Sequence, residues 1–151
     1  MIVEAALAYA HLAAILAWVV FLTSATALAR VEWLNAAALV RLQRVDRIAV
    51  GAALVTLATG LARVAWGVKG TGWYATQPLL WGKAVLWLAM LGLGVGVTRR
   101  IATWRRRCDA GGQLPDVAGL AWVRRRLMWS THLMVLPPLL AVLLARGIAV
   151  I

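Results

Sequence analysis

Acidic residues are scarce in this chain of 151 residues, which has 5 Asp and Glu against 16 Lys and Arg. Inside its long apolar runs, Glu4 is the only carboxylate. Proton-coupled transporters place carboxylates within their membrane spans to carry protons. The scarcity of carboxylates therefore disfavours that class of protein.

Cysteine occurs once, at Cys108, in a predicted loop. A single cysteine excludes an internal disulfide and a cysteine-based metal site. The sequence also has no CxxC pair, no phosphate-binding glycine loop, no HExxH motif and no nucleophile elbow. Nothing in it supports the hydrolytic or nucleotide chemistry of soluble enzymes.

Apolar sequence is abundant, because hydrophobic residues make up 64% of the chain and charged residues 14%. Four apolar runs cover roughly residues 4–29, 48–66, 78–98 and 127–150. About 20 helical residues cross a hydrocarbon core that is about 30 Å thick. We therefore predict an all-α integral membrane four-helix bundle, with residues 1–151 forming one domain. Span one lacks a preceding Lys or Arg, so we expect it to be retained rather than cleaved as a signal peptide.

Twelve of the 16 basic residues lie in two of the gaps between the runs. They are Arg30, Arg41, Arg44, Arg47, Arg99, Arg100, Arg105, Arg106, Arg107, Arg124, Arg125 and Arg126. The positive-inside rule places these gaps in the cytoplasm and both termini on the outer, periplasmic side of a bacterial inner membrane. Arginines beside membrane spans are expected to bind anionic lipid headgroups, not nucleic acid.

The segments that flank the spans carry local signals. Val31–Gln43 mixes apolar and charged residues and predicts a short amphipathic helix on the inner membrane surface between spans one and two. Asp46 is placed to cap the N-terminus of span two, and Pro78 to begin span three. Pro137 and Pro138 should kink span four.

Two histidines lie within the spans, and their depths differ. His11 is about seven residues from the outer end of span one, roughly 10 Å deep, whereas His132 enters from the inner side, roughly 8 Å deep. A haem held between both would require them at one height, so this pair is not expected to ligate one iron. For His132, beside Thr131, we expect a hydrogen bond between helices.

The outer third of the bundle holds a more promising group of side chains. Helix connectivity places one ionisable side chain from each span at similar depth: His11, Arg63, Lys83 and Arg146. Glu4 and Trp18 lie seven residues before and after His11, on the same helix face. Cations at this depth need an anion, a water-filled cavity or an interface. The group suits an anionic, partly apolar ligand such as a porphyrin, although snorkelling cations and a hydrogen-bonded interior histidine explain the same pattern.

Two family resemblances follow from particular motifs. The run TGLARVAWGVKGTGWYATQPLLWGK at Thr59–Lys83, the closing LARG at Leu144–Gly147 and the proline in span four resemble an uncharacterised bacterial family of predicted four-helix membrane proteins. That resemblance covers nearly the whole chain and implies no activity.

More remotely, the chain is similar to HemJ-type protoporphyrinogen IX oxidases. His11 and Trp18 in AHLAAILAW and Lys83 in WGK match patterns of that family, whereas its Pro-Arg and Tyr-His motifs at the end of span one are absent. The resemblance implies b-type haem, with His11 as axial ligand to the iron and Lys83 as a functional partner.

Together these features predict an integral membrane haem-binding protein with a redox or porphyrin-related role, and therefore a candidate haem-dependent oxidoreductase. His11 would ligate the iron, and Lys83 would be a second ligand or a catalytic proton donor. Arg63 and Arg146 would pair with propionates, and Trp18 would pack on the ring. The alternative is a non-catalytic subunit or assembly factor of a larger membrane complex; the small residues on its helices also permit a homo-oligomer.

Overall fold

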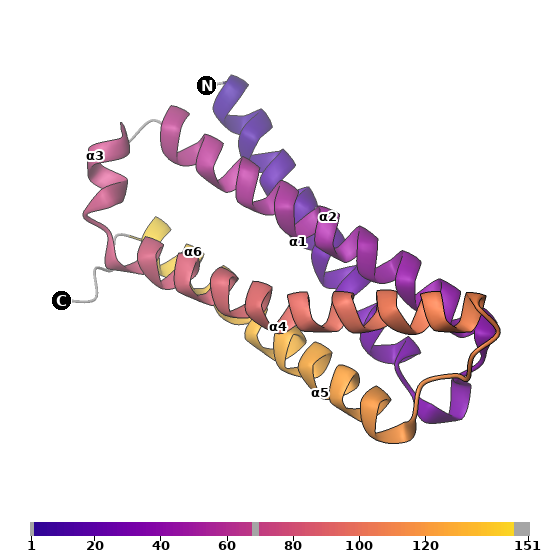
Figure 1. Ribbon diagram of the computed structural model, residues 1–151. Helices are drawn as coiled ribbons and strands as arrows, with labels where there is room; N and C mark the ends of the chain where they lie inside the picture. The colour runs from indigo at the N-terminus through magenta and orange to yellow at the C-terminus, as the bar shows by residue number, and fades with distance from the viewer. Residues whose placement is uncertain (1, 68–69, 147–151) are drawn as a thin grey trace.

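The computed structural model describes residues 2–67 and 70–146, and the regular structure in those ranges is entirely helical (Figure 1). The elements are α1 (Ile2–Leu28), the 3-10 turn η1 (Val31–Trp33), α2 (Ala36–Trp66), α3 (Gly70–Ala75), α4 (Pro78–Asp109), α5 (Val117–Leu133) and α6 (Leu136–Ala145). The end of the predicted fourth span at Val150 lies outside the described residues.

Four helical segments are long and apolar enough to cross a membrane: α1, α2, α4 and the combined α5–α6 segment. The predicted class, an all-helical protein with four membrane-spanning helices, is confirmed at this level. With 32 residues, α4 is about 48 Å long at 1.5 Å per residue, longer than a hydrocarbon core of about 30 Å. The last turns of α4, which include Cys108, therefore continue as helix beyond the predicted span, whereas the sequence predicted a loop there.

The region between the first two spans differs from the prediction. The described residues include no separate amphipathic helix over Val31–Gln43, because α2 begins at Ala36 and continues without a break to Trp66. Asn35 caps α2 by accepting a hydrogen bond from the backbone N–H of Ala38 at 2.8 Å. The prediction that Asp46 caps this helix is therefore wrong: Asp46 lies inside α2 and is 5% exposed.

Proline positions were predicted correctly. Pro78 is the first residue of α4, where its missing N–H costs no helical hydrogen bond. The fourth span is broken in two: α5 ends at Leu133, and α6 begins at Leu136 with Pro137 in its first turn. On the two sides of the break the neighbours differ, because α5 packs against both α4 and α1, whereas α6 packs chiefly against α4.

The hydrophobic core lies at the end of the molecule where α2 begins and α4 ends. Its buried side chains come from the second half of α1, the first half of α2, the second half of α4 and all of α5; Leu39, Ile101, Leu120 and Val123 are almost fully buried. Among the described residues, only two other buried apolar side chains, Ala14 and Leu79, lie outside this core. Close packing is therefore concentrated in one half of the bundle.

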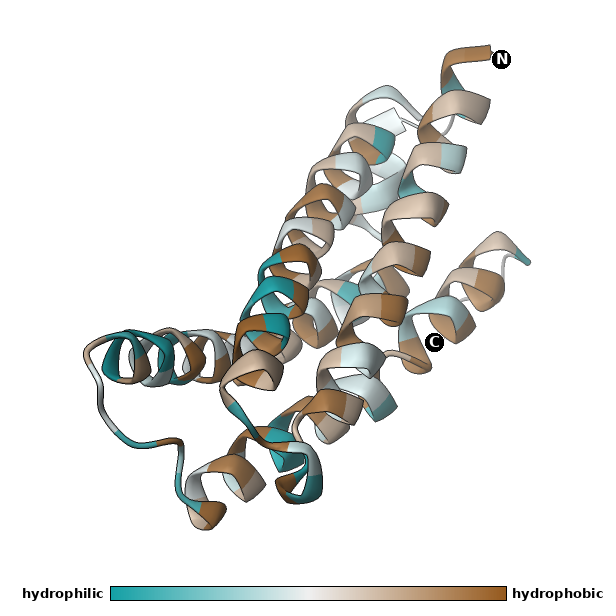
Figure 2. Cartoon of the chain, turned by 90° about the vertical axis from the view of Figure 1, so that its right-hand side faces the viewer, coloured by the Kyte–Doolittle hydropathy of each residue, from teal (hydrophilic) through white to brown (hydrophobic). Residues whose placement is uncertain are grey.

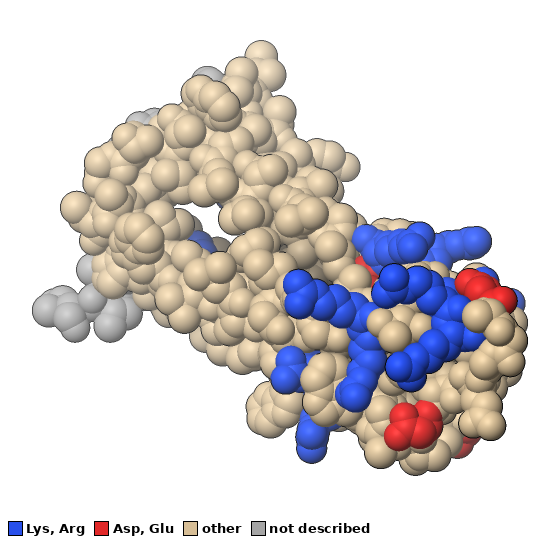
Figure 3. Space-filling model, viewed as in Figure 1, with Lys and Arg blue, Asp and Glu red and all other residues tan. Residues whose placement is uncertain are grey.

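In the other half, the helices separate into two pairs. The helices α1 and α2 stay together, α4 and α6 stay together, and the short α3 connects the two pairs (Figure 1). The space-filling view shows an opening between them, with a basic side chain visible inside (Figure 3). We call this half, which holds the start of α1 and the end of α2, the open half.

Hydrophilic residues gather at the opposite, closely packed end (Figure 2). The helices α1 and α4 end there, α2 and α5 begin there, and most of the visible Lys and Arg side chains cover it (Figure 3). We call it the arginine-rich end. The single ion pair among the described residues, Arg105 with Asp109, also lies there.

Candidate functional site

His11 is held in the open half by two small residues of α2. Its ring nitrogen Nδ1 lies 2.8 Å from Oγ1 of Thr59. A Cβ atom added to Gly60 would lie 3.2 Å from Cε1 of the ring, so the absent side chain of Gly60 is what lets the imidazole lie this close to α2. The side chain of His11 is partly buried as a result.

The hydrogen bonds of Thr59 assign the tautomer of His11. The Thr59 hydroxyl donates to the carbonyl oxygen of Val55 at 2.7 Å. Oγ1 also lies 3.2 Å from the carbonyl oxygen of Thr56. When the one proton of the hydroxyl goes to either carbonyl, Oγ1 accepts from the ring, and Nδ1–H of His11 is the donor. In this assignment Nε2 carries the lone pair, and no hydrogen bond to Nε2 occurs among the described residues. Metal-ligating histidines are commonly held in this way, with one nitrogen hydrogen-bonded and the other free.

Two cations approach this imidazole from different helices. Arg63 of α2 and Lys83 of α4 both lie close enough for their charges to act on His11, and Arg63 also acts on Lys83. Both side chains are partly buried, and within the described ranges neither forms an ion pair. Neighbouring cations that lack an anion repel one another in a medium of low dielectric constant. The site therefore favours an anionic ligand electrostatically.

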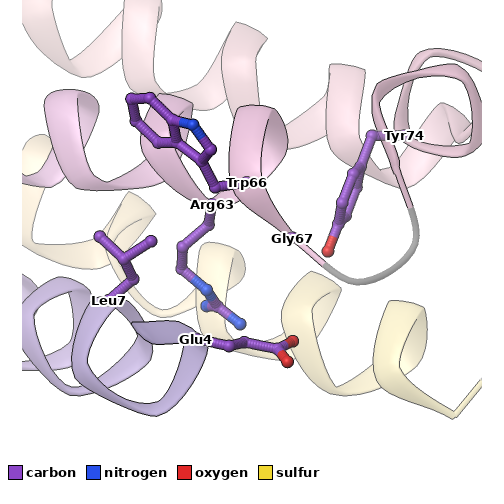
Figure 4. A pocket seen from close by; sticks show the side chains of 6 residues that line it. All are labelled: Glu4, Leu7, Arg63, Trp66, Gly67 and Tyr74. Atoms are coloured by element: carbon purple, nitrogen blue, oxygen red, sulfur yellow. The ribbon is translucent and has the colours of Figure 1, made fainter. Parts of the chain in front are cut away.

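A narrow crevice lies beside Arg63, between α1, α2 and α3 (Figure 4). Its lining residues are Glu4, Leu7, Arg63, Trp66, Gly67 and Tyr74, and it is too narrow to admit a water molecule. The guanidinium of Arg63 points toward the Glu4 carboxylate, and Tyr74 extends into the same crevice from α3 (Figure 4). Ligand pockets usually measure about 300–1,000 Å³, so this crevice is not itself a ligand pocket and does not hold a porphyrin.

Three of the predicted site residues come together, and two do not join them. His11, Arg63 and Lys83 form one electrostatic cluster. Trp18 is 7% exposed and packs in the hydrophobic core, which lies toward the arginine-rich end. Arg146 is exposed just after α6, a helix that packs chiefly against α4.

His132 does not make the predicted bond between helices. It is exposed, and its Nδ1 lies 2.7 Å from the carbonyl oxygen of Met128 in the same helix. Thr131 provides the link between helices, with Oγ1 at 3.3 Å from Oγ1 of Thr26 in α1. The described residues contain no group of three or more His, Cys, Asp and Glu side chains that could hold a metal ion, so a metal here would need a cofactor that brings most of its own ligands.

Sequence reasoning missed the partners that orient His11. Thr59 and Gly60 are small residues of span two, of the kind that allows a close contact between helices, but nothing in the sequence pairs them with His11. It also missed Tyr74, since the contribution of this side chain to the crevice depends on how α3 folds back over the end of α2. No pattern in the sequence indicates that arrangement.

The fold and the cluster together define a helical membrane protein with four candidate spans and a basic site between two helix pairs. The chain belongs to DUF2214, a family described as a predicted membrane protein, whose family model matches residues 3–149. This match confirms the resemblance to an uncharacterised family of predicted membrane proteins. The similarity to HemJ-type oxidases stays a prediction. No curated protein and no solved structure matches the chain.

Proposed function

We propose that this membrane protein binds an anionic porphyrin, b-type haem, in its open half and serves a redox or porphyrin-related role. The observation that carries the proposal is the His11 imidazole, which Thr59 orients beside two cations. Among the described residues neither cation forms an ion pair, although the Glu4 carboxylate lies near Arg63 (Figure 4). A neutral imidazole is a common axial ligand to haem iron, and carboxylates pair readily with Arg and Lys.

In this proposal each residue has a limited task. His11 offers Nε2 to the iron, and Arg63 and Lys83 pair with the propionates; Lys83 is also the candidate proton donor. The bound haem would supply the electron chemistry. Trp18 belongs to the supporting core because the protein's own side chains already cover it, and Arg146 has no proposed contact with the ligand.

The opening between the helix pairs supports a ligand larger than the crevice. It is bordered by the α1–α2 pair, α3 and α4 (Figure 3). A planar, largely apolar ring suits such a space within a membrane. The helix faces around it are in a lipid environment and are therefore apolar, like the ring. We further propose that the arginine-rich end faces the cytoplasm, which would place this opening toward the periplasm of a bacterial inner membrane.

A visible spectrum of the purified protein tests the proposal. Protein extracted in mild detergent should show a Soret band, either as isolated or after addition of haemin. The band should be lost in His11→Ala and kept in His132→Ala, which removes an exposed histidine that bonds only to its own helix. A protein that gains no Soret band with haemin, or that keeps it in His11→Ala, would contradict the proposal.

A second candidate function is that of a non-catalytic subunit or assembly factor. It is favoured by the sparse burial of the open half, where large side chains such as Leu12, Leu61, Val85 and Leu139 are all more than half exposed. A partner helix that packs on this half would cover such residues. Co-purification of a stoichiometric membrane partner with a colourless protein would favour this function.

A further inference from the structure

We infer that the arginine-rich end contains a binding site for the phosphate groups of an anionic phospholipid, built from Arg100, Trp122 and Arg126. This site is independent of the porphyrin proposal, because it lies at the opposite end of the bundle. Three observations support it: the stacking of the two guanidiniums, the absence of acidic partners, and the level of these residues along the spans.

Trp122 of α5 holds both arginines in place. The guanidinium carbon of Arg126 lies 4.2 Å from the Trp122 ring centroid, and that of Arg100, which comes from α4, lies 4.6 Å from it. The absence of a side chain at Gly96 makes room, since a Cβ there would lie 3.1 Å from Cη2 of Trp122. The two helices thus fix two charges around one ring.

Stacking of this kind leaves the arginines able to bind an anion. A guanidinium uses its flat face on an aromatic ring and keeps its N–H groups, which point outward in its plane, for phosphate oxygens. Neither Arg100 nor Arg126 has an acidic partner in the described part of the chain. Donors fixed in this way await an anion from outside the chain.

Helix length places the site at the level of lipid headgroups. About 20 residues of α4, counted from Pro78, cross the hydrocarbon core and end near Val97, just before Arg100. Counting about 20 residues back from Ala145 at the end of α6 reaches Arg126. Basic sites between membrane helices at this level are suited to lipid phosphates. A lipid with two phosphates, such as cardiolipin, matches the two fixed guanidiniums best.

The test measures lipid binding to the purified full chain by native mass spectrometry and by thermal stabilisation in detergent. The probes are cardiolipin, phosphatidylglycerol, phosphatidylcholine and inorganic phosphate. The double variant Arg100→Gln/Arg126→Gln should lose cardiolipin affinity by about tenfold or more, because two positioned, charge-assisted contacts to phosphate are lost. Trp122→Leu keeps both charges and should also weaken binding, because the guanidiniums lose their support.

The matched control is Arg99→Gln/Arg125→Gln, which removes the same charge from adjacent exposed positions that make no ring contact. It should bind cardiolipin almost as the unmodified protein does. Equal losses in the two double variants would overturn the site in favour of diffuse charge attraction. Equal stabilisation by phosphatidylcholine would overturn it as well, and equal stabilisation by inorganic phosphate would assign the site to a soluble anion.

Discussion

The Nδ1 atom of His11 lies 2.8 Å from the Oγ1 atom of Thr59, so a hydroxyl of α2 orients an imidazole of α1. The Thr59 proton is directed to the Val55 carbonyl, which leaves the hydroxyl oxygen as an acceptor for the ring. The orientation of the proposed ligand to iron therefore depends on one residue of a neighbouring helix. This dependence can be tested by substitutions that leave His11 itself in place.

Thr59→Val keeps the shape of the side chain and removes the acceptor for His11. We expect a loss of about 1 kcal/mol in the free energy of unfolding, the usual net value of one hydrogen bond. Haem bound through a freely rotating imidazole should also show a shifted Soret band. The control is Thr23→Val, because the Thr23 hydroxyl bonds only to carbonyls of its own helix. If the two variants behave alike in spectrum and stability, the orienting role of Thr59 is wrong.

Gly60→Ala adds the Cβ atom that would lie 3.2 Å from the His11 ring. The ring must then move by a few tenths of an ångström, and we expect haemin affinity to fall about fivefold, which corresponds to about 1 kcal/mol. Gly51→Ala, in the same helix, meets nothing within 4 Å and should leave the affinity unchanged. Haemin titration of both variants measures the difference, and an unchanged affinity in Gly60→Ala would show that the position of the ring does not matter.

Lys83→Met should affect stability and binding in opposite directions. Removing one of two neighbouring cations relieves repulsion with Arg63, so the ligand-free protein should melt at a higher temperature. Affinity for an anionic porphyrin should fall by about tenfold because a charge-assisted contact is lost. A porphyrin dimethyl ester lacks the carboxylates and should bind Lys83→Met and the unmodified protein equally. If Lys83→Met also weakens binding of the ester, then Lys83 does not act on the propionates.

Asp46→Asn should stabilise the protein. Asp46 is 5% exposed and forms no ion pair within the described ranges; the Thr98 side chain of α4 and the charge of Arg47 act on it. A buried carboxylate without a salt-bridge partner is costly, and an amide of the same shape, which can still bond to Thr98, is less so. A gain of about 1 kcal/mol would raise the melting temperature by about 2–4 °C. Asp109→Asn, which removes an exposed ion pair, is the control; a larger loss of stability in Asp46→Asn than in this control would contradict the account.

The four spans could be predicted from the sequence because lipid imposes a length on each apolar run. The depth argument put His11, Arg63 and Lys83 in one group, and in the structure the charges of Arg63 and Lys83 act on His11. Depth could not place Arg146, because α6 packs chiefly against α4 and depth says nothing about direction around the bundle axis. Apolar length also says nothing about where a helix ends beyond the membrane, so the continuation of α4 to Asp109 and the burial of Asp46 were missed.

The role of His11 as an iron ligand is the central claim, and rescue by free imidazole tests it most directly. His11→Gly removes the ligand and leaves space for an imidazole molecule. Haemin titration of the unmodified protein should saturate at one haem per chain, His11→Gly should lose that Soret band, and added imidazole should restore it. A Soret band in His11→Gly that equals that of the unmodified protein without imidazole, or no saturable band in the unmodified protein, would contradict the account.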